Sequence, residues 1–204
     1  MKKGKFIVIE GGDGAGKSTQ IKMLKDFFGE IIVTTREPGG TEYAEAIRDL
    51  ALKHPLAGNA DGKTLFMLMW GSRAEHMNHL IVPALNNGKF VVTDRFDSST
   101  FAYNIFAQDQ TDAVDYFWET RSFILGEHFP DLYIYLNVSP EVSKARMSGR
   151  DEKNHFDERS QEFHEKVKIG FSKFFEKVPH VIIDADRTPE EVFESIKTEI
   201  QKHL

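Results

Sequence analysis

The sequence predicts a three-layer α/β fold in which a five-stranded parallel sheet is flanked by helices. Five short runs are nearly continuous in apolar residues, which is typical of parallel strands covered on both faces: 6–9, 31–34, 90–93, 132–138 and 181–183. Segments with helical spacing of apolar residues separate these runs, and strands alternating with helices form parallel sheets. The 204 residues contain no linker, repeat or low-complexity stretch, so a single domain over 1–204 is expected.

Six helices are expected between and after these strands. They cover 18–28, 42–52, 64–86, 141–148, 160–178 and 189–204. The fifth places Phe163, Phe171 and Phe174 on one broad face, as a helix packed on a sheet does. The last has a clear start signal, because Thr188 can cap it and Pro189 suits its first position.

Composition excludes several classes of function. The net charge of −6 gives no support for binding a nucleic-acid polymer or a membrane surface. With no cysteine, the chain has neither disulfides nor thiolate metal sites. The basic start at 1–5 is followed by an apolar stretch that ends at Glu10, which is too short for an export signal or a membrane span. The cytoplasm is therefore the expected location.

The loop after the first strand carries the phosphate-binding pattern G-x-x-x-x-G-K-[ST], here read as Gly-Gly-Asp-Gly-Ala-Gly-Lys-Ser. Its glycines let backbone N–H groups turn toward phosphate oxygens, and the next helix adds its positive end. Lys17 is expected to reach the β- and γ-phosphates, and Ser18 to ligate Mg²⁺. A plain glycine-rich turn is the alternative. The predicted ATP-binding residues here are Gly11, Gly12, Asp13, Gly14, Ala15, Gly16, Lys17, Ser18 and Thr19.

Asp94 and Arg95 follow the third strand, at the sheet edge where ligands of α/β folds bind. An acidic residue there suits Mg²⁺ and an arginine suits a phosphate, although an ordinary strand-end ion pair is the alternative. The second strand leads into Arg-Glu-Pro-Gly-Gly-Thr at 36–41, which is a surface turn or a substrate loop. Arg73 interrupts the apolar face of the helix 64–86 and is a candidate for a base carbonyl or a phosphate.

The polar segment 146–158 is either a solvated loop or a short lid whose arginines close over the transferred phosphate. Phosphoryl transfer to an ionised monophosphate requires no general base. The histidines His76, His79, His155 and His164 are therefore interpreted as surface or packing residues.

Taken in order along residues 6–175, these blocks resemble the thymidylate kinase family of P-loop NTPase fold, which phosphorylates dTMP with ATP. The segments carrying the resemblance are the phosphate loop, Arg36–Thr41, Arg73–His76, Asp94–Phe96 with Ser99–Tyr103, and Pro130–Glu141. The most specific is Arg-Glu-Pro-Gly-Gly-Thr. The resemblance implies transfer of the γ-phosphoryl group to dTMP, with Mg²⁺ as cofactor and a homodimer as the typical assembly.

The resemblance also assigns roles to individual residues. The expected catalytic residues are Asp13, Lys17, Arg95 and Arg150. Arg146 would assist at ATP, and Ser18 and Asp94 would serve the metal. The expected substrate-binding residues are Asp13, Arg36, Pro38, Phe66, Met69, Arg73, Arg95, Ser99, Thr100 and Tyr103. Among these, Arg73 and Thr100 would face the base, and Tyr103 would lie beneath the sugar.

The sequence departs from the family pattern at several positions. Met69 stands where a phenylalanine usually stacks on thymine, and Phe66, one helical turn earlier, is a possible substitute. Gly14 stands where some members carry an arginine, so a lid arginine would take that part, with Arg150 first and Arg146 second. Two alternatives therefore stay open: a nucleoside-monophosphate kinase with another base preference, and a nucleotide-binding regulatory ATPase without an acceptor.

Overall fold

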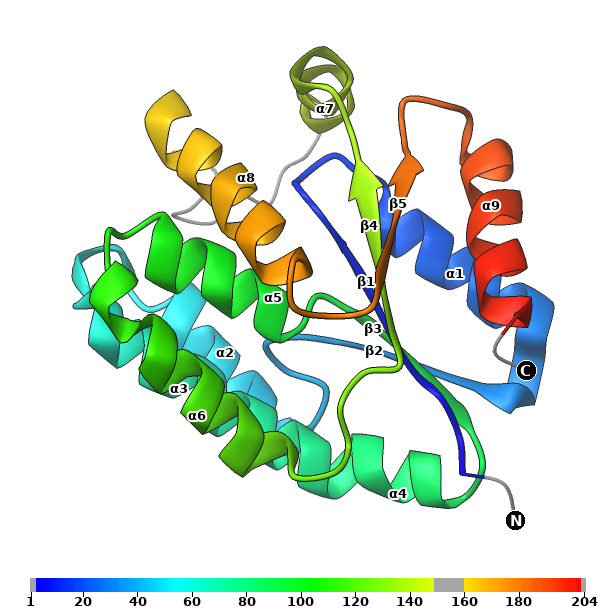
Figure 1. The fold of residues 1–204 in the computed structure, drawn as a ribbon, viewed down its shortest axis with the longest axis horizontal. Coiled ribbons are helices and arrows are strands. Elements are labelled where there is room, and N and C mark those ends of the chain that lie inside the picture. Colours follow the sequence, from blue (N-terminus) through cyan, green and yellow to red (C-terminus); the bar gives the residue numbers. More distant parts are fainter. Residues whose placement is uncertain (1–2, 149–159, 203–204) are drawn as a thin grey trace.

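A computed structural model describes residues 3–148 and 160–202 of the chain. It confirms the predicted sheet of five parallel strands, with spatial order β2-β3-β1-β4-β5 (Figure 1). The strands are β1 (Phe6–Gly11), β2 (Ile32–Arg36), β3 (Phe90–Asp94), β4 (Leu132–Asn137) and β5 (His180–Asp184). Their register places Arg36 opposite Asp94 and Ile9 opposite Asp94, so the ends of β1, β2 and β3 meet at one edge.

Helices cover both faces of this sheet. They are α1 (Lys17–Phe28), α2 (Glu42–Leu52), α3 (Gly62–His76), α4 (Val82–Asn86), α5 (Asp97–Thr100), α6 (Val114–Leu125), α7 (Pro140–Met147), α8 (Gln161–Phe175) and α9 (Pro189–Gln201). Within the described ranges, no helix combines the length and apolar character needed to cross a membrane.

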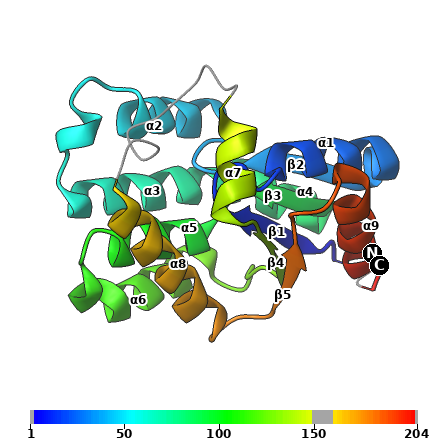
Figure 2. The same cartoon turned by 90° about the horizontal axis from the view of Figure 1, so that it is seen from above.

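The alternation of β1 side chains divides the core into two clusters. Ile7 and Ile9 pack with side chains of α1 and α9 on one face. Phe6 and Val8 pack on the other face with an aromatic cluster contributed by α3, α6 and α8. Figure 2 shows α1 and α9 grouped apart from α3, α6 and α8. Burial of both faces explains why the strands read as nearly continuous apolar runs.

The long helix expected at 64–86 is interrupted by a π-helical turn at Met77–Ile81, which separates α3 from α4. Two helical stretches were not expected from the sequence. The first, α5, continues into a π-helical turn at Phe101–Phe106. The second, α6, buries only a narrow stripe that includes Arg121, while its Phe123 is 84% exposed. A buried arginine and an exposed phenylalanine obscure the helical hydrophobic period.

A buried polar cluster anchors the start of α5. One carboxylate oxygen of Asp97 accepts from Arg121 Nε at 2.5 Å, and the other accepts from the Tyr133 hydroxyl at 2.6 Å. The Asp97 and Tyr133 side chains are fully buried, and Arg121 also lies over the Phe129 ring. A carboxylate in this position needs all its partners, because an unpaired buried charge is costly. The cluster therefore fixes α5 to both α6 and β4.

Replacing Asp97 with alanine is expected to lower the free energy of unfolding by about 3–5 kcal/mol, because it leaves the Arg121 charge buried without its partner. Urea denaturation monitored by circular dichroism measures this. Asp26, an exposed carboxylate on α1, is the matched control, and Asp26→Ala should stay within about 0.5 kcal/mol of the parent. Equal effects of the two changes would contradict the anchoring role of Asp97.

Candidate active site

The candidate site lies at the carboxyl edge of the sheet, between β1 and β3. After β1 the chain enters α1 on one face, and after β3 it enters α5 on the other. Adjacent strands whose connections diverge to opposite faces leave a crevice at their ends, and this is where α/β folds bind ligands. Most residues expected at the site from the sequence lie on the loops and helix starts around this crevice.

The phosphate loop is closed by its own lysine. Lys17 Nζ donates to the carbonyls of Gly11 and Gly12, each at 3.0 Å. Gly14 and Gly16 have φ values of 76° and 90°, a region that glycine enters without a steric penalty. Burial and then the nearby Arg95 lower the pKa of Lys17, while Asp94 and Asp13 oppose the shift. Phosphate oxygens beside Lys17 would favour its charged form in the same way.

Arg95 is held directly across from this loop. Its Nη2 donates to Asp13 Oδ1 at 2.7 Å, and its Nη1 donates to Ser99 Oγ and to the Gly11 carbonyl, both at 3.2 Å. The guanidinium also lies 5.3 Å from the centre of the Tyr103 ring. The structure thus joins Asp13 of the phosphate loop with Arg95, Ser99 and Tyr103 of the segment after β3, all of which were expected at the site.

Arg95 is also one of two non-glycine residues in the described ranges with a left-handed backbone, at φ 66°. Such a conformation is uncommon for a long side chain and persists where surrounding contacts enforce it. Here the Arg95 N–H donates to the Ile9 carbonyl at 3.0 Å, and the Thr93 hydroxyl donates to the Arg95 carbonyl at 2.9 Å. The turn directs the side chain back over β1 toward the phosphate loop.

Glu10 was not singled out from the sequence, yet its buried carboxylate connects the loop to α5. It accepts from the Phe96 N–H at 3.1 Å, from Ser98 Oγ at 2.7 Å and from Ser99 Oγ at 3.1 Å. Burial raises the pKa of Glu10, while Arg95, the Ser98 hydrogen bond and Lys17 act in the opposite direction. Its only signal in the sequence is its place between a buried strand and the phosphate loop.

The two residues expected at the metal lie together. Ser18 Oγ donates to Asp94 Oδ2 at 3.3 Å, although the residues are far apart in the chain. A hydroxyl and a carboxylate are the hard oxygen donors that Mg²⁺ prefers, and Mg²⁺ keeps the rest of its shell from waters and phosphates. Among the described residues, no group of three or more histidine, aspartate or glutamate side chains is arranged to hold a metal. This donor set therefore fits a nucleotide-bound Mg²⁺ rather than a closed protein site.

Arg73 and Thr100, which are both buried, are also brought together. Arg73 Nη2 donates to Thr100 Oγ1 at 3.0 Å, and its Nε donates to Glu37 Oε2 at 2.8 Å. The guanidinium is 2% exposed and lies over the rings of Trp70 and Phe96. The structure therefore brings these two residues into contact and adds Glu37 as a buried partner of Arg73.

The loop after β2 carries further positive charge. Arg36 pairs with Glu45 at 2.9 Å on the exposed side. Arg48, which the sequence analysis did not name, donates to the Pro38 carbonyl at 2.7 Å. Burial and the neighbouring Arg36 lower the pKa of Arg48, and Asp94 and Arg95 also act on it. Arg48 and the loop 36–41 that it contacts therefore lie close to Asp94 and Arg95.

Phe66 and Met69, three residues apart on α3, pack in different clusters. The Phe66 ring contacts the rings of Trp70, Tyr116 and Phe117 in the aromatic core. Met69 packs in a separate small cluster of buried residues with Ala51 and Leu65. The structure gives Phe66 a core-packing role, and its service as a substitute stacking ring stays only a prediction.

Helix α7 packs against the phosphate loop and donates hydrogen bonds to two of its carbonyls. Ser143 Oγ donates to the Asp13 carbonyl at 2.7 Å, and Arg146 Nη1 donates to the Gly14 carbonyl at 3.3 Å. Arg146 is thus placed beside the loop, as expected. Arg150 and the rest of the expected lid, 149–158, lie outside the described residues.

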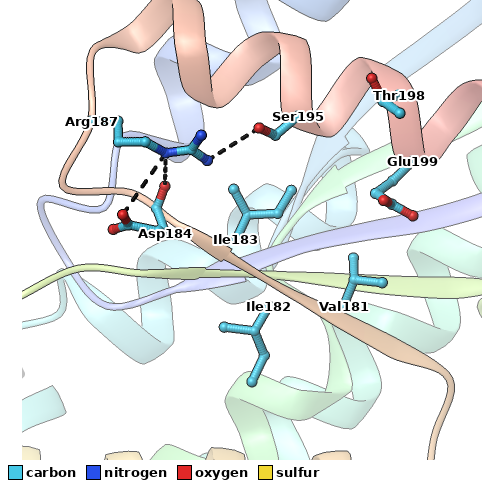
Figure 3. A pocket seen from close by; sticks show the side chains of 8 residues that line it. All are labelled: Val181, Ile182, Ile183, Asp184, Arg187, Ser195, Thr198 and Glu199. Atoms are coloured by element: carbon cyan, nitrogen blue, oxygen red, sulfur yellow. Dashed lines mark hydrogen bonds and ion pairs between the residues drawn. The ribbon is translucent and has the colours of Figure 1, made fainter.

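A hollow of about 370 Å³ opens between β5 and α9 (Figure 3). Within it, Arg187 already donates to the Asp184 carbonyl and to Ser195 Oγ, both at 3.1 Å. None of the residues predicted for the site lines this hollow. The chemistry-bearing residues belong instead to the crevice between β1 and β3.

Comparisons with known proteins decide between the families that such a crevice allows. The family model described as thymidylate kinase matches residues 9–196. The chain belongs to the thymidylate kinase family. A thymidylate kinase of Mesoplasma florum is 40% identical over 98% of this chain and 96% of its own length. One of Clostridium novyi is 36% identical over 97% and 98%, respectively.

The fold agrees with that membership. The crystal structure of thymidylate kinase from Ehrlichia chaffeensis superposes with a TM-score of 0.76 at 27% identity, covering 98% of this chain and 99% of that one. The resemblance inferred from the sequence motifs, the α/β fold and the assignment as an ATP-dependent nucleoside-monophosphate kinase are thereby confirmed. The reading as a regulatory ATPase without an acceptor is set aside.

The phosphate loop of this family member has no room for a side chain at Gly14. A Cβ there would lie 2.8 Å from the Ser143 carbonyl oxygen and 2.9 Å from its Cα, in addition to the strain of a φ of 76°. We therefore expect Gly14→Ala to weaken ATP binding about tenfold or more, measured by isothermal titration calorimetry.

Gly12 provides the matched control in the same loop. A Cβ at Gly12 would meet nothing within 4 Å, so Gly12→Ala should keep the ATP affinity within about twofold. If Gly14→Ala binds ATP as well as Gly12→Ala does, the close fit against α7 does not shape the loop.

Proposed function

We propose that the crevice between β1 and β3 is where this thymidylate kinase transfers the γ-phosphoryl group of ATP to dTMP, giving dTDP and ADP. The observation that carries this placement is the contact between Arg95 and Asp13 at 2.7 Å. It places Arg95, the cation proposed for the acceptor phosphate, beside the phosphate loop proposed to hold ATP. The two substrates would then meet end to end, as in-line phosphoryl transfer requires.

On the donor side, the N–H groups of the loop 11–18 and Lys17 bind the phosphates of ATP. The helix α1 begins at Lys17 and turns its positive end toward them. Arg146, beside the Gly14 carbonyl, adds positive charge from the other side of the loop. Ser18 and Asp94 would hold Mg²⁺, which when bound neutralises charge on the β- and γ-phosphates.

On the acceptor side, Arg95 binds the phosphate of dTMP, with Arg36 and Arg48 adding charge and the Pro38 loop closing over it. Asp13 lies near the sugar 3′-hydroxyl, and Tyr103 lies beneath the sugar. In the absence of substrate, Asp13 neutralises Arg95. The acceptor oxygen is ionised near neutral pH, so the residues align the reactants and stabilise charge without removing a proton.

At the far end of dTMP, Arg73 and Thr100 face the base edge. Among the described residues, Arg73 Nη1 is buried and has no hydrogen-bond partner. A buried guanidinium nitrogen that lacks an acceptor favours a ligand carbonyl in that position. Thymine and uracil present such a carbonyl where cytosine presents an amino group, which supports dTMP over dCMP as the acceptor.

The acceptor role of Arg95 is tested by Arg95→Ala. We expect the KM for dTMP to rise by about two orders of magnitude, because a charge-assisted contact to phosphate is lost. ATP binding should change by less than about fivefold. Equal loss of ATP and dTMP binding would show that Arg95 does not hold the acceptor phosphate.

The base assignment is tested by a coupled assay of the parent enzyme with dTMP, dUMP, dCMP, dGMP and UMP. A tenfold preference for another base would reject dTMP as the acceptor.

We further propose a cytoplasmic homodimer that uses an exposed apolar surface on α2, α3 and α6. In Figure 1 these helices lie side by side, and α3 packs between the other two. Their exposed large apolar side chains are Tyr43, Leu50, Met67, Tyr116 and Phe123, each about half exposed or more. Apolar patches of this kind on a folded domain typically mark interfaces.

Met67 lies on the middle helix, so Met67→Glu is expected to convert the dimer to monomers by burying a charge at the interface centre. Light scattering coupled to gel filtration measures the mass. Ile182→Glu on the edge strand β5, where Ile182 is 62% exposed, is the control and should leave the mass unchanged. A monomeric parent protein would reject the proposal.

A further inference from the structure

A continuous line of polar side chains links β2 to α3 behind the acceptor site. Thr35 Oγ1 lies 2.7 Å from His76 Nε2, and His76 Nδ1 lies 3.0 Å from Glu37 Oε1. The second carboxylate oxygen, Glu37 Oε2, accepts from Arg73 Nε at 2.8 Å. The line therefore ends on the guanidinium that we place at the base edge.

The partners of His76 determine where its proton lies. A carboxylate can only accept, so Nδ1 of His76 carries the hydrogen and donates it to Glu37. In the neutral ring Nε2 is then an acceptor, and the Thr35 hydroxyl donates to it. His76 is fully buried, and Glu37 is 4% exposed. The sequence interpretation of His76 as a packing residue therefore omits two directional hydrogen bonds.

The guanidinium of Arg73 is held by two hydrogen bonds and two aromatic rings. Glu37 holds its Nε and Thr100 holds its Nη2, while its plane lies 4.4 Å from the Trp70 ring centre and 4.9 Å from that of Phe96. Of the three guanidinium nitrogens of Arg73, Nη1 is the one that has no hydrogen-bond partner among the described residues. A planar guanidinium held in this way presents its remaining N–H groups in one direction.

We propose that His76 and Glu37 are positioning residues, which orient Arg73 so that its Nη1 recognises a carbonyl oxygen on the acceptor base. The inference rests on the role proposed above for Arg73. Without His76, Glu37 keeps one oxygen unpaired in a dry site and turns away from Arg73 to satisfy it. Arg73 then keeps its charge but loses its fixed direction.

The same histidine supports the loop that covers the acceptor. A Cβ at Gly40 would lie 2.3 Å from His76 Nε2 and 2.7 Å from Thr35 Oγ1. The Gly-Gly turn therefore lies directly against the imidazole. Both the base contact and the loop at 36–41 depend on one buried side chain, while none of the described contacts of His76 involves the ATP loop.

Because His76, among the described residues, contacts the acceptor side and not the ATP loop, its substitution should affect dTMP binding and not ATP binding. In His76→Leu, which keeps bulk but removes both hydrogen bonds, the KM for dTMP should rise about tenfold. The KM for ATP should stay within about twofold, and kcat should change less than the KM for dTMP. In His76→Asn the side-chain N–H can replace Nδ1–H, so most of the dTMP affinity should return.

Two further variants keep the test decisive if His76→Leu folds poorly. Thr35→Val removes only the outer hydroxyl and should raise the KM for dTMP about threefold. His79, which is 65% exposed on the same helical stretch and pairs with Glu75, is the matched control. His79→Leu should leave all three constants unchanged.

The outcomes separate this inference from the role of Arg73. If Arg73→Ala raises the KM for dTMP while His76→Leu and Thr35→Val leave it unchanged, the positioning role is wrong and the base contact stands. If Arg73→Ala leaves it unchanged, the base contact fails and the inference falls with it. Equal changes in the KM for ATP and dTMP would show a general structural effect and would also overturn the inference.

Discussion

The buried carboxylate of Glu10 is the constraint on which the site depends. It sits at the end of the central strand β1 and accepts hydrogen bonds from the Phe96 N–H and the hydroxyls of Ser98 and Ser99. These donors all follow β3, so one side chain couples the strand that leads to the phosphate loop with the segment that enters α5. Because the group is fully buried, any change in this geometry leaves a charge or a donor unsatisfied.

The same logic governs the cations around the crevice. Arg95 is paired with Asp13, and Arg73 with Glu37, while Lys17 is bound by loop carbonyls. Each positive group that we propose for the reaction is thus held in place by a partner within the protein, which a phosphate or a base carbonyl would supplement or replace. Preorganised charge of this kind stabilises a transition state without reorganisation at the moment of transfer. It also explains why so many carboxylates accumulate in a site that binds anions.

The sequence predicted the strands well because burial on both faces leaves a strong apolar signal, and it predicted the phosphate loop because the glycine spacing is nearly unique. It missed α6, whose buried stripe contains Arg121, and the π-helical turns, which shift the hydrophobic period. Within the site it identified Arg73 and Thr100, but not Glu37, which pairs with Arg73. Pairings such as Ser18 with Asp94 or Asp13 with Arg95 join distant segments, and no local pattern encodes them. Motifs reveal the chemistry of each residue, but the three-dimensional fold determines which residues meet.

The contacts that hold Arg73 matter because Met69 stands where a phenylalanine usually stacks on the base. Its thioether packs with Ala51 and Leu65 between α2 and α3, and a flexible side chain there gives a base less orientation than a flat ring would. Arg73 compensates for this, because it lies between the Trp70 and Phe96 rings and is tied to Glu37 and Thr100. In the proposed site, discrimination between pyrimidines would then depend more on a directed N–H group than on stacking. A hydrogen-bonding site rejects the wrong exocyclic group by leaving a buried donor unpaired, which is a larger penalty than the loss of a partial stacking contact.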